Sequence, residues 1–141
     1  MHTTESTLFQ HLNIPSDVLW DQVTFIRTVR SGIPGQILRE AIELLGSRDL
    51  FVRLLHTSSA NLNDYYHRKT LDTVDSEEIL DTLRVYFEAL KIWGSHEATK
   101  EWLHTPVPAL LGEQPVNLFD TFEGRQWVRQ VLRKIEYGEF T

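Results

Sequence analysis

The last twenty residues carry the pattern that most restricts what this chain can fold into. Four apolar residues recur at the i, i+3, i+4, i+7 spacing of one helical stripe: Val128, Val131, Leu132 and Ile135. Arg125, Arg129 and Arg133 recur every four residues, and we expect them on a second, solvent-facing side of the same helix. Thr121 can cap the start, and Gly138 supplies the left-handed residue that commonly ends a helix. The pattern predicts one amphipathic helix with an apolar inner face and a charged outer face.

Two aromatic residues, Tyr137 and Phe140, come at the end of this helix with little chain left to bury them. Such a pair can contact a partner protein, because aromatic side chains are common anchors of interfaces. It can equally fold back onto its own domain, and the arginine stripe can equally be an ordinary solvated face. The residues alone leave both interpretations open.

Helical periods continue through the rest of the chain, with capping residues predicted at Ser47, at Ser58 or Ser59, and at Ser95, and with helix stops at Gly46 and Gly94. The predicted helices span residues 17–29, 34–45, 48–55, 60–69, 76–93 and 96–103, followed by two short proline-started turns within 105–112 and 114–119. In the first helix we expect Leu19, Val23 and Ile26 to face inward. The longest helix begins after Ser76, and its apolar residues wrap more than one face, as in a central helix or a dimer interface. The sequence therefore predicts an all-α fold.

Composition limits the class of protein. The chain has 141 residues, 41% of them hydrophobic, with no cysteine and no run of eighteen apolar residues. These values fit one domain or two small subdomains that share a core, and they argue against a membrane span, a disulfide framework or a thiolate metal site. The net charge of −6 argues against non-specific nucleic-acid binding by the whole molecule, although residues 27–69 hold seven basic and four acidic groups. We expect a cytoplasmic protein.

The C-terminal third combines spaced tryptophan, proline and glycine residues with a terminal Ile-Glu-Tyr-Gly. In order, the pattern consists of Trp102, Leu103, Pro106, Ala109, Leu110, Leu111, Gly112, Pro115, Leu118, Asp120, Thr121, Gly124, Val128, Leu132, Arg133, Lys134, Ile135, Glu136, Tyr137 and Gly138. It resembles the C-terminal toxin-binding domain of the Xre/MbcA/ParS-type antitoxins, and the resemblance extends more loosely over the rest of the chain. The departures are small: Phe119 stands where a second leucine is common, and Lys134 stands where arginine precedes Ile135.

The resemblance implies a dimeric antitoxin of a type II toxin-antitoxin system, an Xre-like partner of a RES-domain toxin that consumes NAD or ADP-ribosylates. It implies that the C-terminal domain binds this toxin, and our hypothesis is that the last helix lies over the active-site cleft of the toxin. The implied toxin-binding residues are Arg125, Arg129, Arg133, Lys134, Tyr137, Gly138 and Phe140. In this interpretation the cations pair with polar groups of the cleft, and the aromatic residues anchor the tip.

Two short predicted helices, 48–55 and 60–69, have the outline of a helix-turn-helix. In the antitoxin family this region resembles a degenerate Cro-like motif that binds operator DNA and represses the operon. The implied DNA contacts are Ser58, Asn61, Asn63, Tyr66, His67, Arg68 and Lys69. The turn between the helices lacks the usual glycine, Asp64 lies among the candidates, and these side chains can equally form a solvated face. Dimerisation would double the small positive charge available to phosphates.

The expected organisation has three parts: a tail over residues 1–15, an Xre/Cro-like helix-turn-helix region over 16–74, and the long helix with the toxin-binding domain over 75–141. The principal alternative is a solitary dimeric helix-turn-helix transcriptional regulator with no toxin partner. A third interpretation is an all-α domain that senses a small molecule through its tryptophans.

The sequence shows no phosphate-binding glycine loop and no histidine pair with metal-binding spacing. The best polar constellation is His96, Glu97, Glu101 and His104, which we interpret as the polar face of a helix. Serine, histidine and aspartate residues are scattered, and their geometry cannot be inferred from the sequence. We therefore expect no enzymatic activity, no cofactor and no metal.

Overall fold

The computed structural model describes residue 12 and residues 14–138, and every regular element in this part of the chain is helical. The elements are α2 (Asp17–Trp20), α3 (Gln22–Ser31), α4 (Gly35–Leu45), α5 (Arg48–Leu54), α6 (Ser59–Tyr66), α7 (Thr73–Trp93), α8 (His96–Leu103), the 3₁₀ turns η1 (Pro108–Leu110) and η2 (Pro115–Leu118), and α9 (Phe122–Glu136). The all-α prediction is confirmed. No helix among the described residues is long and apolar enough to cross a membrane.

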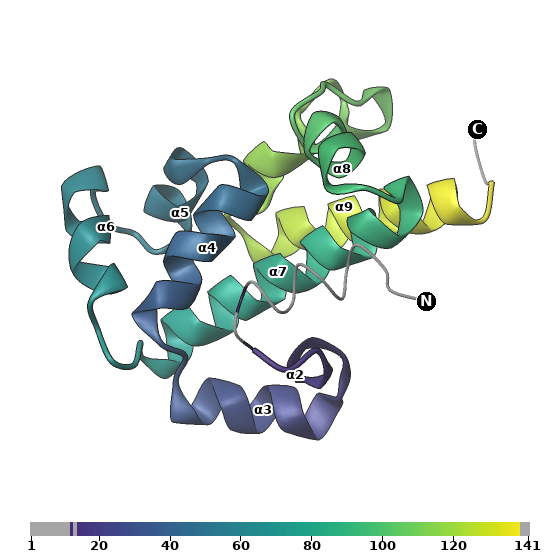
Figure 1. Cartoon of the computed structure of the whole chain (residues 1–141). Coiled ribbons are helices and arrows are strands. Elements are labelled where there is room, and N and C mark those ends of the chain that lie inside the picture. The colour runs from purple at the N-terminus through teal and green to yellow at the C-terminus, as the bar shows by residue number, and fades with distance from the viewer. Residues whose placement is uncertain (1–11, 13, 139–141) are drawn as a thin grey trace.

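α7 runs through the middle of the molecule and packs against helices from both halves of the chain, namely α2, α3, α4, α8 and α9 (Figure 1). Its buried apolar residues point to several sides: Ile79, Leu80, Leu83, Val85, Tyr86, Phe87, Ala89 and Leu90. A helix that is apolar on several faces has to be covered on several sides. The interpretation of this segment as a central helix is confirmed, and it contributes to one core cluster that extends from Leu12 to Leu132.

Local signals set most of the helix boundaries. Four predicted capping side chains accept a hydrogen bond from the backbone N–H three residues later: Ser47, Ser58, Ser95 and Thr121. Gly46 and Gly94 end α4 and α7 in the left-handed conformation, as predicted. His56 takes the left-handed conformation (φ 53°) in the turn between α5 and α6, where the sequence has no glycine. Histidine is one of the residue types that tolerate this conformation best.

The prediction of a single first helix over residues 17–29 is wrong. The backbone is extended at Asp21, whose carboxylate accepts a hydrogen bond from the Thr24 N–H and caps a separate helix, α3. The break changes which side of the segment faces the core, so Val23 and Ile26, expected inside, are exposed. The buried residues of α3 are Phe25 and Val29.

The predicted start of the longest helix at Ser76 is also wrong. α7 begins one turn earlier, where the Asp72 carboxylate accepts a hydrogen bond from the Asp75 N–H. Ser76 is buried inside the helix, and its Oγ accepts a hydrogen bond of 3.0 Å from the Ile33 N–H. The serine therefore ties the connection between α3 and α4 to α7 instead of capping a helix.

α9 packs along α7, and η1 and η2 also pack against it. Its predicted apolar stripe is buried: Val128, Val131 and Leu132 are at most 6% exposed, and Ile135 is partly buried against the core. Burying a valine or leucine side chain contributes about 1.5–3 kcal/mol. The stripe therefore fixes which side of α9 faces α7, and with it the position of every polar residue on this helix.

Candidate functional site

A buried ion-pair network joins the first half of α9 to α7. The Arg125 guanidinium donates from Nε to Asp81 Oδ2 at 2.7 Å, from Nη2 to Glu78 Oε1 at 2.9 Å, and from Nη1 to the carbonyl oxygen of Phe119 at 2.8 Å. The Arg125 side chain is only 1% exposed. Each of its three nitrogens thus has a partner within the protein, so this arginine has a structural role in the free chain.

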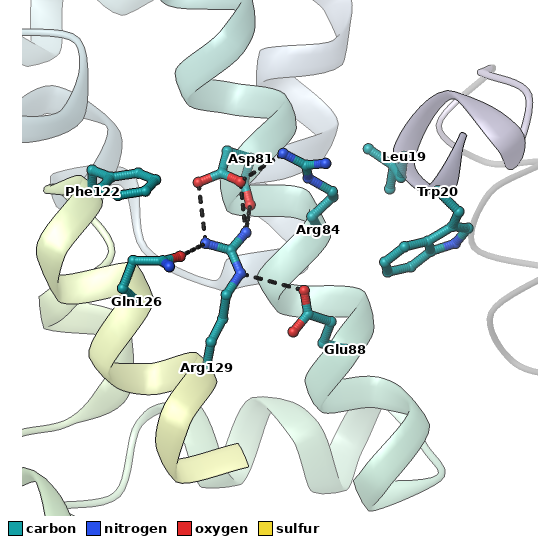
Figure 2. A pocket seen from close by; sticks show the side chains of 8 residues that line it. All are labelled: Leu19, Trp20, Asp81, Arg84, Glu88, Phe122, Gln126 and Arg129. Carbon is teal, nitrogen blue, oxygen red and sulfur yellow. Dashed lines mark hydrogen bonds and ion pairs between the residues drawn. The ribbon is translucent and has the colours of Figure 1, made fainter. Parts of the chain in front are cut away.

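Arg129 extends the network by one helical turn. It donates from Nη2 to Asp81 Oδ1 at 2.6 Å and from Nη1 to Gln126 Oε1 at 2.6 Å, and its Nε lies 3.4 Å from Glu88 Oε1. Arg84 approaches the same Asp81 Oδ1 with its Nη2 at 3.1 Å. Figure 2 shows the Asp81 carboxylate between Arg84 and Arg129, with Gln126 and Glu88 on either side of the Arg129 guanidinium.

The expectation that the whole arginine stripe faces solvent is wrong for Arg125 and Arg129. With 3.6 residues per turn, positions 125, 128, 129 and 132 follow the i, i+3, i+4, i+7 rule, so both arginines share the buried stripe with Val128 and Leu132. A repeat of every four residues drifts slowly around a helix with 3.6 residues per turn. Only its third member, Arg133, therefore lies off the buried stripe, and this residue is exposed. The sequence held one signal of this arrangement, because Asp81 is an isolated acid in the apolar stretch of the longest helix.

The network determines the ionisation of Asp81. Burial alone would raise the pKa of its carboxyl group, but the hydrogen bonds and positive charges of Arg129 and Arg125 outweigh burial and hold this pKa below its ordinary value. The carboxylate is therefore charged near neutral pH and satisfied by its partners. A group held in this way serves to orient α9 and does not offer a proton for catalysis.

A shallow groove of about 390 Å³ lies between α2 and α9, over α7. Its polar lining includes Asp81, Arg84 and Arg129, and Figure 2 shows Trp20 and Phe122 on opposite sides of it. Lys91 lies 4.2 Å from the centre of the Trp20 ring. Because the charged side chains of the lining pair with one another, the groove presents no unpaired acid or base to a substrate.

The end of α9 differs from its first half. Arg133, Lys134, Tyr137 and Gly138 are exposed, and Tyr137 is 71% exposed. Within the described part of the chain the Arg133 and Lys134 side chains form no ion pair or hydrogen bond. Gly138 has a φ of 69°, as predicted for the residue that ends this helix. Phe140 lies outside the described residues.

The two helices predicted to form a helix-turn-helix, α5 and α6, are held together by Arg48, a residue that the sequence did not single out. Arg48 lies at the start of α5 and donates to the Ser59 hydroxyl at 2.9 Å, the Ser59 carbonyl at 2.6 Å and the Tyr66 hydroxyl at 2.7 Å. Its Nη2 also lies 3.4 Å from Asn63 Oδ1. One guanidinium thus fixes α6 against α5 along most of its length.

The residues predicted to contact DNA fall into two groups. Asn61 projects from the exposed side of α6. The helix ends at Tyr66 and not at residue 69, so the exposed residues His67, Arg68 and Lys69 follow it in the chain. The other candidates are engaged within the fold: the Ser58 hydroxyl caps α6, and the Asn63 and Tyr66 side chains contact Arg48.

The polar residues around α8 converge only in part. Glu97, Glu101 and His104 line an open pocket together with Gly46 and Lys100, and His96 is not among its lining residues. The His96 Nδ1 hydrogen-bonds the Tyr86 hydroxyl, whereas His104 Nε2 lies 2.8 Å from the carbonyl oxygen of Leu45. Burial, followed by the negative charge of Glu97, raises the pKa of the Tyr86 hydroxyl. Among the described residues, no three or more His, Cys, Asp or Glu side chains are placed so that they could hold a metal ion.

Two comparisons with known proteins cover the part of the chain that contains α9. Residues 88–138, from the second half of α7 to the end of α9, match the family described as "Antitoxin Xre/MbcA/ParS C-terminal toxin-binding domain". The chain is also 26% identical over 126 residues to the "Prs ADP-ribosylating antitoxin" of Sphingobium sp. (strain YBL2), an alignment that covers 82% of this chain and 79% of that protein. The C-terminal part of the chain is thus similar to the toxin-binding domain of the Xre/MbcA/ParS-type antitoxins, and the longer alignment supports an antitoxin of this type.

Proposed function

We propose that this chain neutralises a RES-type toxin, one that consumes NAD or ADP-ribosylates its target, by placing the end of α9 over the active-site cleft of the toxin. One observation carries the proposal: residues 88–138 match a toxin-binding domain and end in an exposed cationic and aromatic tip. The name of the Sphingobium relative, "Prs ADP-ribosylating antitoxin", supports ADP-ribosyl transfer as the chemistry of the toxin.

The residues of α9 have two separate roles in this proposal. Arg133 and Lys134 have no ion-pair partner among the described residues, so they are available to acidic or polar groups of the toxin cleft. Tyr137 supplies an aromatic anchor. The buried Arg125 and Arg129 act as positioning residues, because their bonds to Asp81 set the direction in which the tip projects.

The second half of the proposal is autorepression through residues 16–74. Exposed Asn61 can bond an adenine edge, while Arg68 and Lys69 can bind phosphates at the end of α6. The Arg68 guanidinium stacks 4.1 Å from the centre of the Tyr65 ring, which limits its freedom. A homodimer would present two such helices to the two halves of an operator and double the number of phosphates neutralised.

Two double charge-reversal variants test toxin neutralisation and DNA binding separately. In cells that also express the product of the neighbouring gene, the double variant Arg133→Glu/Lys134→Glu should lose growth rescue and bind that protein at least about tenfold more weakly. The matched double variant Arg68→Glu/Lys69→Glu makes the same change in net charge on the other surface. It should keep rescue, lose repression of an operon reporter, and show a salt dependence of DNA binding reduced by about one phosphate contact per cation.

Arg133 and Lys134 are exposed and unpaired among the described residues, so the first variant should retain the circular dichroism spectrum and melting temperature of the unchanged chain. The Arg68→Glu/Lys69→Glu variant should retain the spectrum, with a small decrease in melting temperature because Arg68 no longer stacks on Tyr65. Full rescue by the Arg133→Glu/Lys134→Glu variant would show that the end of α9 does not contact the toxin cleft. If the neighbouring gene product is neither toxic nor bound, while the chain still represses the reporter, the chain is a solitary helix-turn-helix regulator.

A further inference from the structure

Leu111 stands out in the middle of the connection between α8 and α9, directly after η1. Its side chain is 85% exposed, more than any other large apolar side chain in the described residues. Its backbone is left-handed, with φ 56° and ψ 33°. Apart from His56, it is the only non-glycine residue with positive φ in that part of the chain.

Neither property stabilises the free chain. In the left-handed conformation a Cβ lies too close to the following carbonyl oxygen, which is why glycine usually occupies such positions. A leucine exposed to water also gains nothing from burial. Glycine at position 111 would relieve the backbone and expose no apolar side chain, so the leucine side chain contributes little to the stability of the free fold.

The loop around Leu111 is ordered by its own backbone. The Val107 N–H donates to the Glu113 carbonyl at 3.1 Å, and the Gly112 N–H donates back to the Val107 carbonyl at 3.0 Å. The neighbouring Leu110 is fully buried and anchors the turn to the core. Leu111 therefore projects from a loop that is already ordered in the free chain, and binding through this side chain would cost little conformational entropy.

The position of the loop identifies its partner. Leu111 lies within residues 88–138, the segment that matches a toxin-binding domain, and the turn η1 that precedes it packs against α9. We propose that Leu111 is a second anchor for the toxin, inserting into an apolar pocket next to the cleft that receives the end of α9. This inference rests on the proposed function, and it adds a hydrophobic contact to a tip that is cationic and aromatic.

The test compares two truncations of exposed apolar side chains. Leu111→Gly removes the side chain and relieves the left-handed backbone, so the melting temperature should be unchanged or raised. The dissociation constant for the purified product of the neighbouring gene should nevertheless increase at least about tenfold, as expected when a buried leucine is lost from an interface. The control is Val74→Ala, which truncates a 69% exposed side chain at the start of α7, outside the matched segment, and should leave the affinity unchanged.

A photo-crosslinking residue at position 111 identifies the protein that contacts this position, and we expect a crosslink to the toxin. A crosslink only between two copies of this chain would overturn the proposal that Leu111 contacts the toxin. Equal affinity of the Leu111→Gly variant and the unchanged chain would overturn the anchor while leaving the proposed function intact. Failure of the unchanged chain to bind the toxin would overturn the proposed function, and this inference with it.

Discussion

At the scale of single residues, the main feature of this protein is a carboxylate that holds two arginines of another helix. Asp81 contacts both Arg125 and Arg129, and its side chain is 8% exposed. Removing one member of a buried ion pair is costly because the remaining charge loses its partner in a medium that solvates it poorly. Here one substitution would leave two guanidinium groups without their central acceptor.

We therefore expect Asp81→Asn to lower the free energy of unfolding by about 3–5 kcal/mol. The matched control is Asp49→Asn, which removes the exposed ion pair between Asp49 and Arg53 on α5. Exposed pairs contribute little, so the control should change the free energy by no more than about 1 kcal/mol. Urea denaturation of the three proteins measures both values, and equal effects would show that the network does not hold α9 on α7.

The same carboxylate predicts a dependence of stability on pH. The pKa of Asp81 is lower in the folded protein than its ordinary value of 3.8, so the folded state binds this proton more weakly than the unfolded chain. The stabilisation is complete above about pH 4 and is lost as the pH falls through the folded-state pKa. Denaturation midpoints measured from pH 7 down to about pH 2 should fall more steeply below about pH 4 for the unchanged chain than for Asp81→Asn. Parallel curves would contradict this assignment.

At the scale of elements, the start of α9 depends on a close approach between backbones. A Cβ atom placed on Gly124 would lie 1.9 Å from the carbonyl oxygen of Leu118 and 2.9 Å from Oγ1 of Thr121, the residue that caps the helix. Glycine inside a helix normally costs stability relative to alanine. In α9 it is required, because η2 passes directly over the first turn.

Gly124→Ala should consequently destabilise the protein by about 1–3 kcal/mol, although the same change at an exposed helical site would stabilise it. Gln130→Ala, on the exposed side of the same helix, is the control and should stay within about 0.5 kcal/mol of the unchanged chain. Thermal and urea denaturation are the measurements. A Gly124→Ala variant as stable as the unchanged chain would mean that η2 moves away at no cost.

At the scale of the complete fold, α7 joins the helices of the first half of the chain to the region with α9. It packs against α2, α3 and α4 from the first half of the chain and against α8 and α9 from the second, and one core cluster includes residues of all of them. Single domains of this size usually unfold in one cooperative step. We expect the two regions to unfold together.

Two optical probes test this expectation. Far-ultraviolet circular dichroism follows all helices, whereas tryptophan fluorescence comes mainly from the second half, where Trp93, Trp102 and Trp127 lie. The two urea curves should coincide, and Asp81→Asn should shift both by the same amount. Separate transitions would instead support independent domains on either side of residue 75.

The sequence predicted the elements of this fold well where a few neighbouring residues decide the outcome. The caps at Ser47, Ser95 and Thr121 and the stops at Gly46 and Gly94 all depend on groups within one helical turn. The exposed end of α9 was also predicted, because Arg133, Lys134 and Tyr137 lie off the apolar stripe. The DNA-binding and toxin-binding roles of these surfaces stay predictions.

Contacts between residues far apart in the sequence decided which polar side chains are buried. Whether Arg125 faces water or the core depends on Asp81, forty-four residues earlier in the chain, and arginine spacing on one helix carries no information about an acid on another. In the same way, the burial of Ser76 depends on the Ile33 N–H. Most helix boundaries could thus be predicted from the sequence, since caps and stops act locally. Which charges are buried depends on the folded arrangement of distant segments, because a buried charge is stable only where a distant partner compensates for its lost hydration.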